Sequence, residues 1–245
     1  MDAKAVFEFL SFLGAGRPNF GTRPSWRPNE LQYASVYFGL AGEDAVIRTV
    51  FKHFLGTNTP GCYVDVGCAW PTCISNTYYL YTVGWRGIGV DANKAFAPLW
   101  AKPRPEDVFI WGAVAEDRKQ LYWAEHRSNL GASIVSDTSA PPTGEHTAGI
   151  PVPSLRLDEI FDRYIGEKHI NFLNLDVERT ELSVLKSNDW SRWMPDVVLM
   201  ESGDFSFEAP YADPSVAFLR DRGYKLCDKV GANVLMIHTD AKITP

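Results

Sequence analysis

The stretch Cys62-Tyr-Val-Asp-Val-Gly-Cys68 decides how the chain folds, together with a second stretch, Gly87-Ile-Gly-Val-Asp-Ala-Asn93. Each contains a run of apolar, largely β-branched residues, which is typical of a short buried strand. The first run ends at Gly67, where the backbone must turn sharply, and the second ends at Asp91. A helical pattern lies between them. Strand, turn, helix, strand and terminal acid together predict a βαβ unit that can hold a nucleoside in its crevice.

The residues of this unit also indicate which nucleoside it binds. Gly67 has no Cβ, so a ligand can approach the backbone closely, and Asp91 can accept hydrogen bonds from both hydroxyls of a ribose. Dinucleotide enzymes carry Gly-x-Gly-x-x-Gly here, but the second and third positions are Ala69 and Thr72. Asp65 inside the first strand suits a cationic ligand, so we expect S-adenosylmethionine (SAM). The alternative is an ordinary strand-end aspartate without a ligand.

Composition narrows the class of protein. The chain has 245 residues, of which 45% are hydrophobic and 22% charged, and it can bury a substantial core as one α/β domain. The formal net charge of −6 argues against binding to nucleic acid, which requires clustered Lys and Arg. No apolar run is long enough to span a bilayer. We therefore expect a protein that acts on a small molecule and binds neither nucleic acid nor membrane.

The cysteines and the N-terminus predict a cytoplasmic protein. The four cysteines are Cys62, Cys68, Cys73 and Cys227, and no Cys-x-x-Cys pair occurs among them. Reduced thiols are the plainer interpretation, and these cysteines predict neither a zinc site nor a disulfide framework. Asp2 and Glu8 stand among the apolar residues of the N-terminus, unlike the basic start of a signal peptide.

The pattern along the chain predicts two parts. Residues 1–55 read as an N-terminal helical extension, with an apolar helix at residues 3–13 that would suit a homodimer contact and a helical segment from Glu30 to Leu55. Residues 56–245 read as a single nucleoside-binding unit. Within it, residues 126–153 are polar and rich in Gly, Pro, Ser and Thr, so they predict one long lid or substrate loop that brings His126 near the site.

Three predicted strands in succession end in acids, namely Asp91, Asp176 and Glu201. In an open parallel sheet the carboxyl ends of the strands meet at one edge, where ligands bind. These three acids therefore predict a site at that edge.

At these positions the sequence resembles the FkbM-type methyltransferases, which are SAM-dependent enzymes. The matching pieces are Gly42-Glu-Asp44, Tyr63-Val-Asp-Val-Gly67, Gly84-Trp-Arg-Gly-Ile-Gly-Val-Asp91, Phe172-Leu-Asn-Leu-Asp-Val-Glu178 with Glu181, and Gly223-Tyr224. The resemblance implies an α/β class I methyltransferase (Rossmann-like) fold: a mostly parallel seven-stranded sheet with a C-terminal antiparallel hairpin, preceded by N-terminal helices. It also implies O-methylation of a hydroxyl on a sugar or natural-product intermediate, with S-adenosylhomocysteine (SAH) as the by-product.

The resemblance assigns residues to the site. The expected cofactor-binding positions are Asp65, Gly67, Ala69, Ser75, Asp91, Ala92, Asn93, Ala113, Val114 and Asp176. The catalytic candidates are Asp176, Glu178 and His126, because a neutral hydroxyl needs a base before it can attack. Asp176 also suits cofactor binding, and Glu178 has a structural alternative, which is to stabilise the start of a helix at residues 180–186.

Two departures from the family pattern keep other functions open. Trp70-Pro71 stands where the family has small or polar residues, and Arg179 replaces the glycine after Asp-Val-Glu. Arg179 could recognise an anionic substrate, pair with Glu178 or Glu181, or impair catalysis. The alternatives are a catalytically inactive binding module and a nicotinamide-dependent oxidoreductase, which the missing glycines disfavour.

Overall fold

The structure is a computed structural model that describes residues 36–56, 59–125, 133–137, 147–203 and 205–241. By its internal contacts the chain divides into residues 1–36 and residues 37–245, and every described helix and strand belongs to the larger unit. The expected helix at residues 3–13 lies outside the described residues. None of the described helices is both long enough and apolar enough to cross a membrane.

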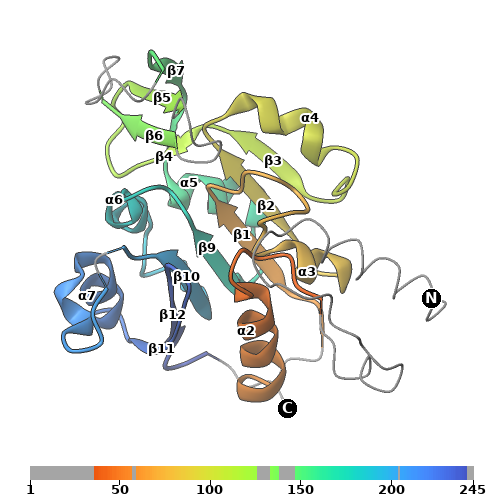
Figure 1. Cartoon of the computed structure of the whole chain (residues 1–245), viewed down its shortest axis with the longest axis vertical. Helices are drawn as coiled ribbons and strands as arrows, with labels where there is room; N and C mark the ends of the chain where they lie inside the picture. The colour runs from red at the N-terminus through yellow and green to blue at the C-terminus, as the bar shows by residue number, and fades with distance from the viewer. Residues whose placement is uncertain (1–35, 57–58, 126–132, 138–146, 204, 242–245) are drawn as a thin grey trace, which may run out of the picture. The chain divides into compact units, whose positions relative to one another are not determined.

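A seven-stranded sheet forms the middle of the larger unit (Figure 1). From one edge to the other its strands are β11 (Tyr224–Val230), β12 (Asn233–His238), β10 (Val197–Glu201), β9 (Phe172–Leu175), β1 (Cys62–Val66), β2 (Arg86–Asp91) and β3 (Val108–Trp111). The pairs from β10 to β3 are parallel, whereas β12 runs antiparallel to both of its neighbours. This topology confirms the predicted class I methyltransferase fold.

The register of the parallel strands brings the predicted acids to one edge. Val66 at the end of β1 lies opposite Val90 of β2 and Leu175 of β9. The next residues along these three strands are Gly67, Asp91 and Asp176. They therefore emerge side by side at the carboxyl edge, where ligands of open α/β sheets bind.

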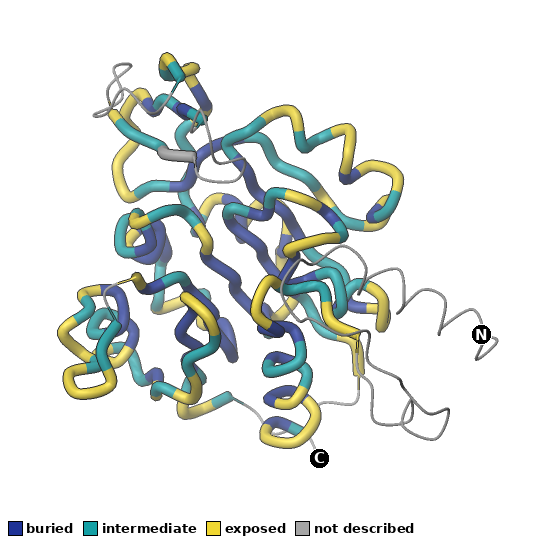
Figure 2. Tube along the Cα trace, viewed as in Figure 1, coloured by how far each residue is buried: buried dark blue, intermediate teal, exposed yellow. Residues whose placement is uncertain are grey.

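Helices cover both faces of the sheet, and alternate strand residues face opposite layers. One layer contains α5 (Leu157–Ile160) with its π-helical continuation η4 (Phe161–Ile165), α6 (Glu181–Lys186) and α7 (Pro214–Arg220). The other contains α2 (Glu43–Thr49) with the π-helical turn η2 (Val50–Phe54), and α3 (Tyr78–Thr82). Val64 of β1 packs into the first layer and Tyr63 into the second. The central strands are accordingly buried along their length (Figure 2).

Gly89 in the middle of β2 is required by packing. A Cβ at this position would lie 2.7 Å from the ring of Trp100, the last residue of α4 (Ala97–Trp100). That helix follows a short 3-10 turn, η3 (Lys94–Phe96), directly after β2. The glycine therefore lets α4 lie flat on the sheet beside the predicted nucleoside crevice.

Two small sheets lie beyond β3. A three-stranded antiparallel sheet has the order β6 (Ser133–Ser136), β5 (Leu121–Glu125), β7 (Ile150–Val152), and β4 (Ala113–Val114) pairs with β8 (Ser154–Leu155). The prediction of one long loop over residues 126–153 is therefore wrong, because β6 and β7 lie within it. β6 has four residues with Ser at both ends, and β7 has three with Pro in the middle, so no alternating pattern is long enough to be recognised.

The predicted helix from Glu30 to Leu55 is also wrong in its first part. Described residues 36–42 are not helical, and α2 begins at Glu43 after Gly42, whose φ is +86°. From there on, the apolar residues of α2 and η2 pack into the layer that contains Tyr63. The boundary expected between residues 55 and 56 stays a prediction. One further 3-10 turn, η5 (Pro210–Ala212), precedes α7.

Candidate functional site

A pocket of about 420 Å³ opens at the carboxyl edge of the sheet. Eight of the expected cofactor positions line it: Gly67, Ala69, Asp91, Ala92, Asn93, Ala113, Val114 and Asp176. The catalytic candidate Glu178 lines it as well, whereas Asp65 and Ser75 do not. His126 lies outside the described residues. The structure thus places residues from three separate parts of the chain around one cavity of the size that small-molecule sites have.

Gly67 lies in the pocket wall where two loops approach each other closely. Its φ is +79°, and a Cβ built on it would lie 1.7 Å from the backbone oxygen of Asp176. The Gly67 amide donates to the carbonyl of Val90 at 2.9 Å. Only glycine fits here, because any side chain would push apart the loops that follow β1 and β9.

Asp91 is held rigidly at the end of β2. Its two carboxylate oxygens accept hydrogen bonds from the amides of Ala69 at 2.8 Å and Asn93 at 2.7 Å. Burial raises the pKa of Asp91 to about 6, although these two amides act in the opposite direction. Each oxygen keeps a second lone pair, so Asp91 can still accept hydrogen bonds from ligand hydroxyls.

Side chains from the α4 region hold the loop with the unusual Trp70-Pro71. The indole of Trp100 donates to the carbonyl of Ala69 at 2.9 Å, and the buried guanidinium of Arg104 donates to the carbonyl of Pro71 at 3.3 Å. Helix α3 begins only at Tyr78, whereas the sequence pattern predicts a helix with Thr72 or Ser75 as its N-cap. The turn is thus kept in place by these donors from the segment after β2. Trp70 itself is partly exposed and lines the pocket.

Asp65 lies beneath the loop in a buried polar network. It accepts hydrogen bonds from Thr77 at 2.5 Å and from Asn174 at 2.8 Å, and Thr77 in turn accepts one from Arg104 at 3.1 Å. Burial raises the pKa of Asp65. Ser75 is likewise buried, and its hydroxyl accepts a hydrogen bond from the amide of Tyr78 at 3.2 Å. Asp65 and Ser75 therefore support the loop after β1 from the protein interior and do not line the pocket.

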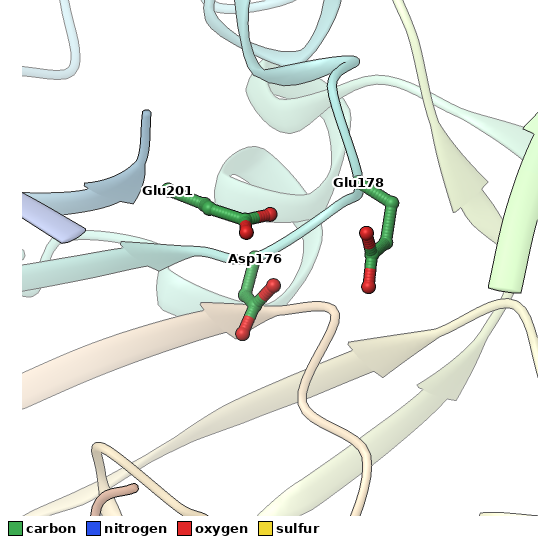
Figure 3. A group of neighbouring side chains, drawn as sticks. All are labelled: Asp176, Glu178 and Glu201. Atoms are coloured by element: carbon green, nitrogen blue, oxygen red, sulfur yellow. The ribbon is translucent and has the colours of Figure 1, made fainter. Parts of the chain in front are cut away.

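Three acids meet beside the pocket. Asp176 follows β9, Glu178 lies two residues later, and Glu201 ends β10; one carboxylate oxygen from each lies within 4.8 Å of the others (Figure 3). Among the described residues no side chain or amide donates a hydrogen bond to these carboxylates. The cluster therefore attracts cations, and its oxygens are ligands of the kind that Mg²⁺, Ca²⁺ or an ammonium group takes.

The surroundings of the cluster shift the proton affinity of its members. Asp176 is open to the pocket on one side, but desolvation by the surrounding protein raises its pKa to about 7, and repulsion by Glu201 and Glu178 adds to the rise. Burial also raises the pKa of Glu178, followed by repulsion from Glu201. A positive charge that binds here would lower both pKa values, because it stabilises the ionised carboxylates.

Two glutamates near the loop between β9 and α6, Glu178 and Glu181, have different roles. Glu181 accepts hydrogen bonds from the amides of Val177 at 3.4 Å and Arg179 at 3.2 Å, so it stabilises the loop that leads into α6. Glu178 makes no such bond with a described residue. The Glu178 carboxylate therefore remains available to a ligand.

Arg179 forms no ion pair with a described residue, so the predicted pairing with Glu178 or Glu181 is wrong at the level of direct contact. Its side chain is exposed, and its φ of +75° is one that glycine adopts more easily. Glu178 before it also has a positive φ of +53°. Two consecutive residues in the left-handed region mark a strained turn beside the pocket.

The three-stranded sheet of β5, β6 and β7 supplies pocket residues that the sequence did not allow us to assign. Trp123 and Glu125 of β5 line the pocket together with Val135 of β6, which pairs with Trp123. The signal was present, because residues two apart on a strand share a face. It could not be used, because the sequence pattern predicts a strand only over Leu121–Trp123.

Every acidic or basic side chain that lines the described pocket is a carboxylate: Asp91, Glu125, Asp176 and Glu178. SAM carries a sulfonium and an ammonium group against one carboxylate, so a pocket with this charge suits it electrostatically. The pyrophosphate of a dinucleotide would be repelled. The residues present therefore fit SAM and disfavour a nicotinamide cofactor.

Comparison with known proteins gives one family. The model of the methyltransferase FkbM domain matches residues 56–226. No curated protein matches the chain significantly. Among solved structures, the chain is similar to a TehB-like SAM-dependent methyltransferase from Corynebacterium glutamicum, with 12% identity, a TM-score of 0.44 and coverage of 86% of this chain and 92% of that one. It is also similar to precorrin-6y C5,15-methyltransferase from Geobacter metallireducens, with 11% identity, a TM-score of 0.39 and coverage of 83% and 90%.

Proposed function

The chain belongs to the FkbM methyltransferase family, whose model matches residues 56–226 of its 245, and we propose that it methylates a hydroxyl group of a small molecule. The family is SAM-dependent, so the chain is a SAM-dependent methyltransferase. The proposed acceptor is a sugar or a natural-product intermediate. The observation that carries the proposal is the Glu178 carboxylate, which lines the pocket and receives no hydrogen bond from the described residues.

The residues around the pocket give SAM a consistent place. Asp91 would accept hydrogen bonds from the ribose hydroxyls, and Asp176 would bind the ammonium group of the methionine part. Ala92, Asn93 and Ala113 would lie along the adenine. When bound, SAM supplies a methyl group that its sulfonium makes electrophilic.

Glu178 acts as the base in this proposal. The acceptor hydroxyl lies between Glu178 and the methionine end of the site, and its proton passes to the carboxylate as the oxygen attacks. Desolvation and the negative charge of Glu201 raise the pKa of Glu178, which makes its carboxylate a stronger base than a free glutamate. The protein otherwise contributes position, because displacement needs the oxygen in line with the methyl group.

Replacing Glu178 with Gln tests this role. Transfer of tritiated methyl from SAM is measured with a panel of sugars and hydroxylated aromatic compounds, and SAH binding is measured by calorimetry. We expect kcat to fall roughly 100-fold or more, as for loss of a general base, while SAH affinity stays unchanged. Glu181→Gln is the matched control, since it removes a nearby carboxylate with a structural task and should lower stability instead.

Two results would refute the proposal. Full turnover in Glu178→Gln would show that Glu178 is not the base. SAH binding without methyl transfer to any member of the panel would favour the inactive binding module.

We also propose a cytoplasmic location and a homodimer. All four cysteines are free thiols, as is usual in a reducing compartment. The dimer would use the apolar pattern at residues 3–13.

A further inference from the structure

One face of β5 meets the pocket at two alternate residues. Trp123 and Glu125 both line the cavity, and their Cα atoms are about 6.6 Å apart, as for residues two apart on any strand. Between them they offer an indole N–H, which is a donor, and a carboxylate, which is an acceptor.

The indole N–H of Trp123 has no partner. The residue is 9% exposed, its Nε1 is shielded from water, and no described residue accepts a hydrogen bond from it. Trp111, which packs nearby, donates from its own Nε1 to the carbonyl of Ala92 at 2.9 Å. A buried donor without a partner is rare and unfavourable, so the difference between the two indoles indicates that a ligand supplies the missing acceptor.

The carboxylate of Glu125 likewise has no hydrogen-bond partner among the described residues. Its backbone amide bonds to the hydroxyl of Thr147 at 3.0 Å, but its side chain accepts no hydrogen bond. Glu125 lies two residues after Trp123 on β5, so the two side chains share one face of the strand and line the pocket together.

Trp123 lies beside residues that follow Asp91 in the pocket wall. Trp123 is in the same buried cluster as Ala113, with Ala92 packed against it. If Asp91 binds the ribose, the base attached to that ribose lies along these residues. The donor and the acceptor of β5 thus meet the ligand at its base.

We infer that Trp123 and Glu125 recognise the edge of the adenine base, an inference that rests on the proposed function. After a small rotation of the indole, Trp123 donates to a ring nitrogen beside the 6-amino group, either N1 or N7. Glu125 accepts a hydrogen bond from the 6-amino group itself. Adenine presents this donor and acceptor next to each other, whereas hypoxanthine has an oxygen at position 6 and repels a carboxylate.

Calorimetric titration of the full-length protein tests both contacts without any methyl acceptor. The ligands are SAH, S-inosylhomocysteine, 1-deaza-SAH and 7-deaza-SAH. Wild type should bind SAH about tenfold or more tightly than S-inosylhomocysteine, as expected for a charged hydrogen-bond partner. Glu125→Gln should bring the two affinities within about threefold, since an amide can face either base.

The deaza ligands locate the Trp123 contact. One of them should bind wild type about fivefold or more weakly than SAH, and Trp123→Phe should weaken SAH binding by a similar factor but leave that analogue unaffected. Glu167→Gln and Trp193→Phe are controls outside the pocket and should keep wild-type affinities. Because the analogues report on wild type alone, the test holds even if a variant fails to fold.

The outcomes separate the two proposals. If wild type binds no SAH, the proposed function itself fails. If wild type binds SAH but equally well binds S-inosylhomocysteine and both deaza analogues, the recognition of adenine by Trp123 and Glu125 is refuted and the proposed function stands. The same holds if Glu125→Gln keeps the wild-type preference for SAH.

Discussion

Asp176 combines properties that favour function and oppose stability. Its carboxylate lies next to Glu201 and Glu178 and receives no hydrogen bond from the described residues. Desolvation by the surrounding protein and these like charges raise its pKa from 3.8 to about 7, although one side of the residue is open to the pocket. The folded protein therefore binds a proton at Asp176 more tightly than the unfolded chain does, so this group stabilises the fold most below about pH 4 and loses that contribution as the pH rises through about 7.

Replacing Asp176 with Asn should stabilise the ligand-free protein at alkaline pH. At pH 8 the wild-type carboxylate is charged and repelled, and we expect the variant to melt about 2 °C or more above wild type. At pH 5 the folded carboxyl is mostly protonated but the unfolded one is already mostly ionised, so the difference should be clearly smaller than at pH 8 without vanishing. Thermal unfolding followed by circular dichroism at both pH values measures this. A variant no more stable than wild type at pH 8 would contradict the pKa shift.

A site residue could be predicted from the sequence where the position of its backbone alone decides whether it lines the pocket. Gly67 and Asp91 end neighbouring strands, so the motif order placed them correctly at the pocket. Asp65 was predicted to bind SAM, but it shares a strand face with Tyr63 and its carboxylate bonds to Thr77. Which face a short strand turns toward the ligand depends on the layers around it. Glu125 was missed because an inserted sheet carries it.

The loop between β9 and α6 shows strain at the scale of an element. Arg179 has a φ of +75° in a position where the family has glycine, and its side chain makes no ion pair with a described residue. Left-handed conformations cost a non-glycine residue about 1–2 kcal/mol. Strain of this kind is characteristic of functional loops.

Replacing Arg179 with Gly should therefore stabilise the protein. Glycine relieves the strain but gives the unfolded chain more freedom, so we expect a net gain of up to about 1 kcal/mol. This corresponds to about 2–4 °C in melting temperature for a chain of this size. Arg179→Ala is the control, since it removes the guanidinium and keeps the strain. If Ala stabilises as much as Gly, the effect comes from charge and not from the backbone.

Elements were predictable in proportion to the strength of their local pattern. The continuous apolar run Val197-Val-Leu-Met before Glu201 predicts a strand over Val197–Glu201, and the structure has the strand with these bounds. Helix α3 begins at Tyr78 and not near Thr72, because the buried network around Arg104 keeps the preceding loop irregular. That network joins residues far apart in the sequence, so no local pattern reveals it.

At the scale of the whole molecule, α2 and η2 belong to the core that supports the site. Three of their apolar residues and the next one along are at most 5% exposed and pack in the layer of Tyr63 and Phe172: Ile47, Val50, Phe51 and Leu55. Burial of four such side chains contributes about 6–12 kcal/mol, which is comparable to the whole stability of a typical domain.

Two deletions test where the folded unit begins. A chain that lacks residues 1–36 should fold, with a sharp thermal transition and the SAH affinity of the full chain. A chain that lacks residues 1–55 should not fold, because it loses α2 and η2. If the shorter chain folds and binds SAH, the boundary predicted from sequence between residues 55 and 56 is correct.

The central claim is that the pocket at the carboxyl edge binds SAM through Asp91. Calorimetric titration of wild type and Asp91→Asn with SAM and SAH tests it most directly, with thermal unfolding of both proteins as the check on folding. We predict micromolar binding by wild type and a loss of about 1–3 kcal/mol in the variant, because the ribose hydroxyls lose a charged acceptor. Absence of binding by wild type, or equal affinities in the two proteins, would contradict the claim.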